Sequence, residues 1–437
     1  MSDVQIGLLT IVGILVLVQS GMHVAISLMV LSFVGVWAIK GNLIIAGNML
    51  QLTAYEGIKA YNFGVIPLFV LMGLLVSVSG IGSDTFAVAA QAFRKVRGGL
   101  GMSTVAANAI FAAVNGSSIA SASVFTKIAV PELLRLGYSP RFSVGVVAGS
   151  SVLGMLIPPS MLLIVLGIAA ELSIGDLFTA GIIPGLLLAA AFCVTIVILV
   201  RFFPGFVGAG GTRTHADMEL EPTSVLIKKI APIVLLILIV LGGIYGGIFT
   251  PIEAGAVGAL GALILTILRR KLNRKVLWQV LIETGYVASS ILFLLVAAHL
   301  YSNMLALSGL PFTISEWVAD SGLGFWAVLG LYLIVIVAMG TILDSPSIIL
   351  IVVPLIMPIM TGFGVPLIWF GIVTIIAVEI GLLTPPFGIA CFTIKTNLDD
   401  PRITLGDIFA GAAPFVITML IVLGIVVAVP WLSLGLL

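Results

Sequence analysis

Two Pro-Pro segments interrupt long apolar runs and free backbone groups that could bind a small ion. They are Leu156-Ile157-Pro158-Pro159-Ser160 and Leu383-Thr384-Pro385-Pro386-Phe387. Proline lacks an amide hydrogen and clashes with the preceding turn, so a helix stops there. A broken helix leaves carbonyl and amide groups unpaired in a bilayer, a state tolerated only around a cavity, an ion or packed protein. The freed carbonyls suit a cation and the freed amides an anion; a kink that serves packing alone is the alternative.

Two polar joints between apolar segments add side-chain oxygens to these backbone groups. The candidates are Asn115, Ser117 and Ser118 in the first joint and Asp344, Ser345 and Ser347 in the second. Sodium is a hard cation, and hard cations prefer oxygen ligands. Neutral oxygens with at most one carboxylate suit a singly charged ion, so the joints predict sodium binding.

Asp344 is the most informative of these residues, because an intramembrane carboxylate costs at least about 2.5 kcal/mol at mid-depth. It could also cap the helix that follows it, and the two roles are compatible. Glu379 lies within an apolar run, five residues before Thr384. The sequence leaves open whether it serves function, beside a cavity or a cation, or structure. Glu253 stands at a predicted helix start, so we expect it to cap that helix.

Composition decides the environment of these segments. Of 437 residues, 61% are hydrophobic and 8% are charged, against roughly a quarter charged in soluble proteins. We therefore expect an all-α integral membrane protein that crosses the bilayer many times. The 19 basic and 18 acidic side chains nearly cancel, which leaves no basic surface for nucleic acid. Two cysteines in apolar runs predict no disulfide.

A membrane-spanning helix needs about 20 apolar residues, and ten stretches are candidates. They are Ile6–Gln19, Val24–Ile39, Val65–Val78, Ser143–Ala169, Leu177–Phe203, Ile230–Phe249, Glu253–Leu268, Val287–Leu307, Ile368–Ile394 and Ile408–Leu432. Two further pairs of shorter apolar segments flank the polar joints, at residues 100–135 and 325–361. Their arms are short for a full crossing, so we expect two re-entrant helical hairpins.

The sequence contains an internal repeat. The same interval of 227 residues separates Gly154, Pro158 and Pro159 from Gly381, Pro385 and Pro386. The polar stretch 204–229 divides the chain, so residues 1–203 and 230–437 are predicted to be two repeats joined by a linker. Lysine and arginine near the helix ends favour a cytoplasmic linker and periplasmic termini. Five crossings and one hairpin in each half give opposite orientations, which is the inverted-repeat design of secondary transporters.

At these residues the sequence resembles the large membrane subunit of tripartite ATP-independent periplasmic (TRAP) transporters. The matching stretches are Asn115–Ser118 leading to Pro131-Glu132, Gly154–Ser160, Gly243–Ala254 and Leu383–Gly388. The resemblance covers essentially the whole chain. It implies a bacterial inner-membrane protein with a scaffold domain and a transport domain that moves as an elevator. It also implies coupling to Na⁺, a small four-helix membrane partner, and a periplasmic binding protein that delivers an organic acid.

The resemblance further implies that the ions bind at the hairpin tips and the facing helix breaks. Carried over residue by residue, the first sodium site comprises Asn115, Ser117, Ser118, Gly154 and Pro158. The second sodium site comprises Gly340, Asp344, Ser345, Thr384 and Pro385. The substrate is expected between tips and breaks, near Ser117, Pro159, Ser160, Ser347 and Pro386.

The resulting hypothesis is a sodium-coupled importer of a small carboxylate, and not an enzyme. One alternative is a stand-alone sodium/dicarboxylate carrier that needs no binding protein. Another is an intramembrane protease built on Asp344, which lacks a second aspartate in a partner motif. The sequence has neither a nucleotide-binding loop nor a nucleophile elbow, so an ion gradient is the expected energy source. Sialic acid, C4-dicarboxylates, other sugar acids and keto acids are all open as substrates.

Overall fold

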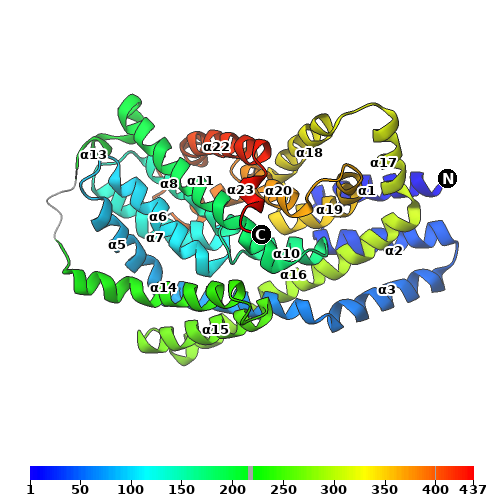
Figure 1. The fold of residues 1–437 in the computed structure, drawn as a ribbon, viewed down its shortest axis with the longest axis horizontal. Helices are drawn as coiled ribbons and strands as arrows, with labels where there is room; N and C mark the ends of the chain where they lie inside the picture. The colour runs from blue at the N-terminus through cyan, green and yellow to red at the C-terminus, as the bar shows by residue number, and fades with distance from the viewer. Residues whose placement is uncertain (215–219, 399) are drawn as a thin grey trace.

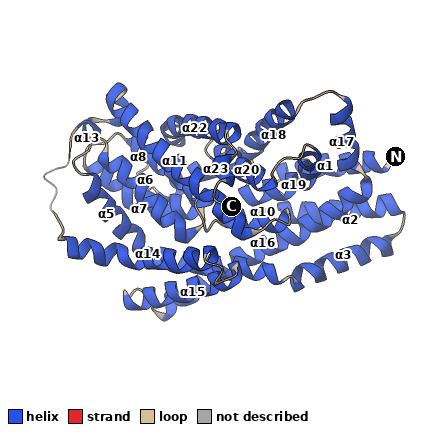
Figure 2. Ribbon diagram, viewed as in Figure 1, coloured by secondary structure: helices blue, strands red, loops and turns tan. Residues whose placement is uncertain are grey.

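The computed structural model describes residues 1–214, 220–398 and 400–437, and every regular element in these ranges is a helix (Figures 1 and 2). Within them, seven helices are long and apolar enough to cross a membrane, or eight if one bent pair counts as a single span. The all-α membrane fold expected from the sequence is confirmed. Residues 215–219 of the predicted linker lie outside the described ranges.

The polar stretch 204–229 separates two sets of helices. The first half contains α1 (Asp3–Gln19), α2 (Val24–Lys40), α3 (Leu43–Lys59), the short η1 (Tyr61–Gly64), α4 (Val65–Val78), α5 (Ile81–Phe93), α6 (Gly99–Asn115), α7 (Ser118–Arg135), α8 (Pro140–Ser151), α9 (Leu153–Leu156), α10 (Met161–Ala169) and α11 (Ile174–Phe202). The linker contains α12 (Pro204–Val207) and α13 (Ala209–Thr212). The second half contains α14 (Thr223–Tyr245), α15 (Pro251–Leu268), α16 (Arg274–Ser308), α17 (Leu310–Asp320), α18 (Phe325–Gly340), α19 (Ser345–Gly362), α20 (Leu367–Leu382), α21 (Ile389–Asn397), α22 (Leu405–Ala428) and α23 (Trp431–Leu434).

Both expected helix breaks and both expected helix pairs are present. Pro158-Pro159 lies between α9 and α10, where the chain bends by 42°, and Pro385-Pro386 lies between α20 and α21. The polar joints separate α6 from α7 and α18 from α19. Glu253 caps α15 in a capping box with Thr250, as expected. Local signals in the sequence therefore located the interruptions correctly.

The helices absent from the predicted stretches include α3, and another helix is longer than predicted. A search for long apolar runs misses α3, because polar residues such as Asn48, Gln51 and Glu56 interrupt the apolar sequence without preventing a helix. The predicted stretch Val287–Leu307 is the C-terminal part of α16, which has 35 residues. In the first turns of α16, Arg274, Lys275 and Glu283 interrupt the apolar residues, so a search for apolar runs passes over them.

Helices of the two halves pack against one another. α4 packs on α15, α2 on α16, α7 on α21, and α8 on α22. The contact between α8 and α22 is a direct backbone approach: a Cβ on Gly145 would lie 2.1 Å from the carbonyl oxygen of Gly411. Beside it, Arg141 Nε donates to Asp407 Oδ1 at 2.8 Å. The two halves are thus interlocked.

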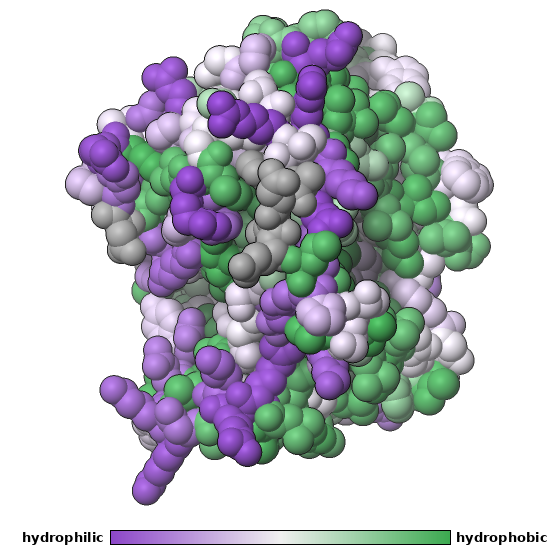
Figure 3. All heavy atoms as spheres, turned by 90° about the vertical axis from the view of Figure 1, so that its left-hand side faces the viewer, coloured by the Kyte–Doolittle hydropathy of each residue, from purple (hydrophilic) through white to green (hydrophobic). Residues whose placement is uncertain are grey.

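The two helix pairs lie toward opposite ends of the molecule (Figure 1). α5, α6 and α7 gather near α13 of the linker, whereas α17, α18 and α19 gather near the N-terminus. Figure 3 looks onto the linker end, where hydrophilic side chains are concentrated, with hydrophobic side chains prominent on one flank. This distribution fits an end in water and a flank in lipid.

The described part of the linker is packed against the base of the first helix pair. Gly210 N–H donates to Gly137 O, and Gly98 N–H donates to Gly211 O, both at 2.9 Å. A Cβ on Gly210 would lie 2.2 Å from Leu136 O, so a larger residue does not fit. The segment holds the turns before α6 and after α7 together.

We predict that Gly411→Ala lowers the melting temperature of the purified protein. Its Cβ would lie 2.1 Å from Arg141 O, so α8 and α22 have to separate, and overpacking of this kind costs about 1–3 kcal/mol. Gly424→Ala in the same helix is the control, because a Cβ there meets no atom within 4 Å. Equal melting temperatures in a thermal unfolding assay would contradict the close contact.

Candidate functional site

The tip of the first helix pair lies against the first helix break. Gly116 O accepts a hydrogen bond from the N–H of Met161, the first residue of α10, at 3.1 Å. Ser117 caps α7, because its Oγ accepts from Ala120 N–H at 3.3 Å. A Cβ on Gly154 would lie 2.7 Å from Ser117 O. The tip and the break therefore satisfy part of each other's backbone.

Four of the five residues predicted for the first sodium site gather at this contact. Asn115 Nδ2 donates to Ser117 O at 3.2 Å, and Ser118 follows directly in α7. Gly73 of α4 packs closely against this tip, since a Cβ on Gly73 would lie 2.8 Å from Asn115 O. Pro158, the fifth residue, faces α11. The result is a buried group of backbone and amide oxygens with almost no room for further side chains.

The tip of the second helix pair meets the second break in a similar way. A Cβ on Gly340 would lie 2.7 Å from the Cα of Gly381, and one on Gly381 would lie 2.5 Å from the Cα of Gly340. Phe387 N–H donates to Thr341 O at 3.2 Å. α18 and α20 thus touch through their backbones directly beside the break.

Asp344 caps α19, which is the role anticipated as compatible with ion binding. Its Oδ1 accepts from Ser347 Oγ at 2.6 Å, and its Oδ2 accepts from Ser347 N–H at 3.4 Å. Both residues line a cavity of about 390 Å³ together with His23 and Ser290. Thr384, by contrast, donates its hydroxyl proton back to α20. The second predicted set is therefore less tightly gathered than the first.

Glu379 connects the two helix pairs. This residue of α20 is 1% exposed. Its Oε2 accepts from Ser118 Oγ at 2.7 Å, and its Oε1 accepts from Ser345 Oγ at 3.2 Å. Ser118 is the first residue of α7 and Ser345 the first of α19. The sequence left the role of Glu379 open; its signal was a carboxylate in an apolar run close to a Pro-Pro pair.

The residues expected near the substrate differ in access. Pro159, Ser160 and Ser347 are buried, Ser117 is half-buried and Pro386 is exposed. Ser160 Oγ is occupied in capping α10, where it accepts from Leu163 N–H at 3.3 Å. The surface beside the second break is open, since Phe387 is 54% and Ile342 43% exposed. Ser117 and Pro386 are thus the members of this set that reach accessible space.

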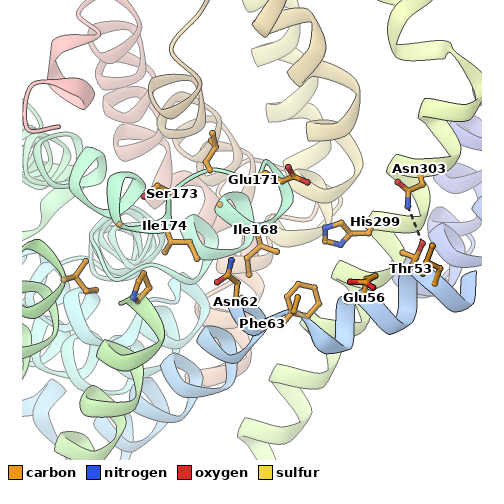
Figure 4. Close-up of a pocket in the computed structure, with 18 of the residues that line it drawn as sticks. Thr53, Glu56, Asn62, Phe63, Ile168, Glu171, Ser173, Ile174, His299 and Asn303 are labelled. Carbon is orange, nitrogen blue, oxygen red and sulfur yellow. Dashed lines mark hydrogen bonds between the residues drawn. The ribbon is translucent and has the colours of Figure 1, made fainter. Parts of the chain in front are cut away.

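A cavity of about 860 Å³ lies between α3, α16 and the connection from α10 to α11 (Figure 4). Glu56, Glu171 and His299 contribute titratable side chains to its wall. Asn303 Nδ2 donates to Thr53 Oγ1 at 3.3 Å on one side. No pattern in the sequence indicated this cavity, because α3, which supplies Thr53 and Glu56, is not an apolar run.

The fold and the site define a helical membrane protein in which hairpin tips and broken helices surround buried polar groups, an arrangement typical of secondary transporters. The YdaH transporter of Alcanivorax borkumensis has the same fold, with a TM-score of 0.58 over 87% of this chain and 88% of that chain at 14% identity.

Sequence comparison identifies the family. The model described as "Tripartite ATP-independent periplasmic transporter, DctM component" matches residues 11–432. A C4-dicarboxylate TRAP transporter large permease protein of Pseudomonas aeruginosa is 33% identical over 388 residues, which cover 89% of this chain and 88% of that protein. A protein of the same name from Rhodobacter capsulatus is 30% identical over 404 residues, covering 89% and 90%.

The chain therefore belongs to the DctM component family of TRAP transporters, the large permease subunits. The resemblance seen in the sequence is confirmed. These relatives are permeases rather than enzymes. Membership of this family and the apolar helices together make this a multi-pass protein of the inner membrane. Transporters of this family are described as tripartite, which implies two further components.

We predict that Gly340→Ala loosens the second tip, because its Cβ requires space that Gly381 occupies. Overpacking of about 1–3 kcal/mol would speed amide hydrogen exchange of residues 341–347 roughly 5- to 150-fold. Gly330→Ala in α18 is the control, since a Cβ there meets no atom within 4 Å. Unchanged exchange in Gly340→Ala would show that the tip does not depend on this contact.

Proposed function

We propose that this chain is the large membrane subunit of a sodium-coupled importer of a small organic acid. The observation that carries the proposal is that each hairpin tip contacts a helix break and that both tips donate a hydroxyl proton to Glu379. Such contacts concentrate backbone and side-chain oxygens, which a sodium ion requires. The P. aeruginosa relative is named for C4-dicarboxylates, which supports a carboxylate as the cargo.

One Na⁺ would bind at the first tip and another at the second. The first would use Asn115, Ser117, Ser118, Gly154 and Pro158, of which all but Pro158 lie around one turn. The second would use Gly340, Asp344, Ser345, Thr384 and Pro385. Asp344 would have to turn from the cavity beside His23 toward the break, or act on the ion from a distance. The organic acid would bind where the second break is open, near Ser117 and Pro386.

The two halves, residues 1–203 and 230–437, would be inverted repeats joined by a cytoplasmic linker. Two features support this orientation: the helix pairs lie toward opposite ends, and the N-terminus lies away from the linker (Figure 1). The basic residues near the linker favour the cytoplasm for that end. With the repeats in opposite orientations, both chain termini would be periplasmic; in Figure 1 the N-terminus lies at the end away from the linker and the C-terminus near the middle of the long axis.

Transport would proceed by an elevator movement of the part that carries both helix pairs. A cavity of about 860 Å³ separates α3 and α16 from the α10–α11 connection. It supports this proposal because it leaves space between the scaffold, which would contain α3 and α16, and the moving part, which would contain the α10–α11 connection. A small four-helix membrane subunit would complete the scaffold, and a periplasmic binding protein would deliver the acid. The family's description as tripartite supports both partners.

We predict that Asp344→Asn weakens sodium dependence. Uptake of labelled succinate, a C4-dicarboxylate, is measured in proteoliposomes with both partner components while Na⁺ replaces choline. Loss of a charged hydrogen-bonding group should raise the sodium concentration for half-maximal uptake by about tenfold. Asp320→Asn, at the exposed end of α17, is the matched control. If Asp344→Asn kept the sodium dependence of the wild-type protein, Asp344 would not be part of the sodium site.

The binding protein distinguishes this proposal from a stand-alone sodium/dicarboxylate carrier. We predict that proteoliposomes without the soluble component take up no succinate above the level of liposomes that lack the transporter. Adding the binding protein should restore uptake in proportion to its concentration. Full uptake without it would favour the stand-alone carrier.

A further inference from the structure

Glu379 occupies the point at which the second arms of both hairpins begin. Its two carboxylate oxygens each accept one serine hydroxyl, from Ser118 at 2.7 Å and from Ser345 at 3.2 Å. All three side chains are buried, with 2% exposure or less. One side chain therefore ties together two segments that are separated by more than 200 residues of sequence.

These two bonds fix the direction of both hydroxyl groups. An ionised carboxylate can only accept hydrogen bonds, so each serine turns its O–H toward Glu379. The lone pairs of both serine oxygens then point away from the carboxylate, as those of a cation ligand must. Ser118 belongs to the first proposed sodium site and Ser345 to the second. The same carboxylate thus prepares one ligand of each site.

The starts of two helices offset part of the cost of a negative charge on Glu379. α7 begins at Ser118 and α19 at Ser345, so the positive ends of two helix dipoles meet at the carboxylate. A buried carboxylate is costly unless it is paired, and none of the ion pairs among the described residues includes Glu379. A cation at either tip would supply the missing positive charge.

We infer that Glu379 is a positioning residue shared by the two sodium sites, and that it couples them. This inference rests on the proposed sodium-coupled function. An ion at one tip holds that tip's serine in place and so orders the carboxylate. The ordered carboxylate then holds the serine of the other tip with its lone pairs available. Sodium binding at one hairpin therefore makes binding at the other easier.

Two cysteine reporters test each hairpin separately. Ile119→Cys in α7 and Ile342→Cys at the second tip replace side chains that are 39% and 43% exposed. Cys193 and Cys391 are first replaced by alanine. The full chain, with its small membrane subunit in nanodiscs, is alkylated with a maleimide while Na⁺ replaces choline at constant ionic strength. Sodium is expected to slow alkylation at both reporters.

Glu379→Gln should raise the sodium concentration needed for half-maximal protection by about tenfold or more at both reporters. Each serine variant should also affect the other hairpin: Ser345→Ala shifts the sodium titration at Ile119→Cys, and Ser118→Ala shifts it at Ile342→Cys. Thr374→Val is the control. Thr374 lies in α20, as Glu379 does, and the substitution removes its buried hydrogen bond with Tyr332 of α18. Both sodium titrations should be unchanged.

An unshifted titration at either reporter in Glu379→Gln would overturn the inference. If that variant does not fold, the serine variants decide: effects confined to the hairpin that carries each substitution would overturn the coupling. Sodium that protects the parent protein no better than choline or potassium would overturn the proposed sodium coupling, and this inference with it. If sodium protects the parent protein and Glu379→Gln leaves the titrations unshifted, the inference alone is overturned.

Discussion

A chain that breaks its helices inside a membrane has to satisfy the freed backbone groups from within its own fold. Here each break is met by a hairpin tip: Met161 N–H donates to Gly116 O, and Phe387 N–H donates to Thr341 O. Neither member of such a pair is stable alone at that depth. The placement of the polar oxygens, the close backbone contacts and the buried carboxylate all follow from this mutual dependence.

Glycine allows the backbones of the tips and the breaks to come into direct contact. Gly154 beside Ser117, and Gly340 beside Gly381, leave no space for a Cβ. Gly116 has a φ of +65° and turns the first tip between α6 and α7. Because side chains are absent at these points, backbone carbonyls rather than methyl groups face the breaks. An ion site made largely of main-chain oxygens needs that geometry.

The sequence predicts the helical class, both joints and both breaks because apolar runs and proline act locally. It does not predict α3, whose polar residues hide it, or the cavity that α3 lines. The sequence singles out Asp344 and leaves the role of Glu379 open. Only tertiary packing brings Ser118 and Ser345 to Glu379, while Asp344 lies in the wall of a cavity that His23 also lines. The ions, the elevator movement and the orientation stay predictions.

The bond between Ser118 and Glu379 joins residues 261 positions apart, which has a consequence for biosynthesis. Translation at about 5–20 residues per second puts roughly 15–50 s between the emergence of the serine and that of its acceptor. Throughout this interval the Ser118 hydroxyl lacks its carboxylate acceptor. The first tip therefore gains this partner only once α20 has been synthesised, and a chain that ends before α20 lacks this bond between its two halves.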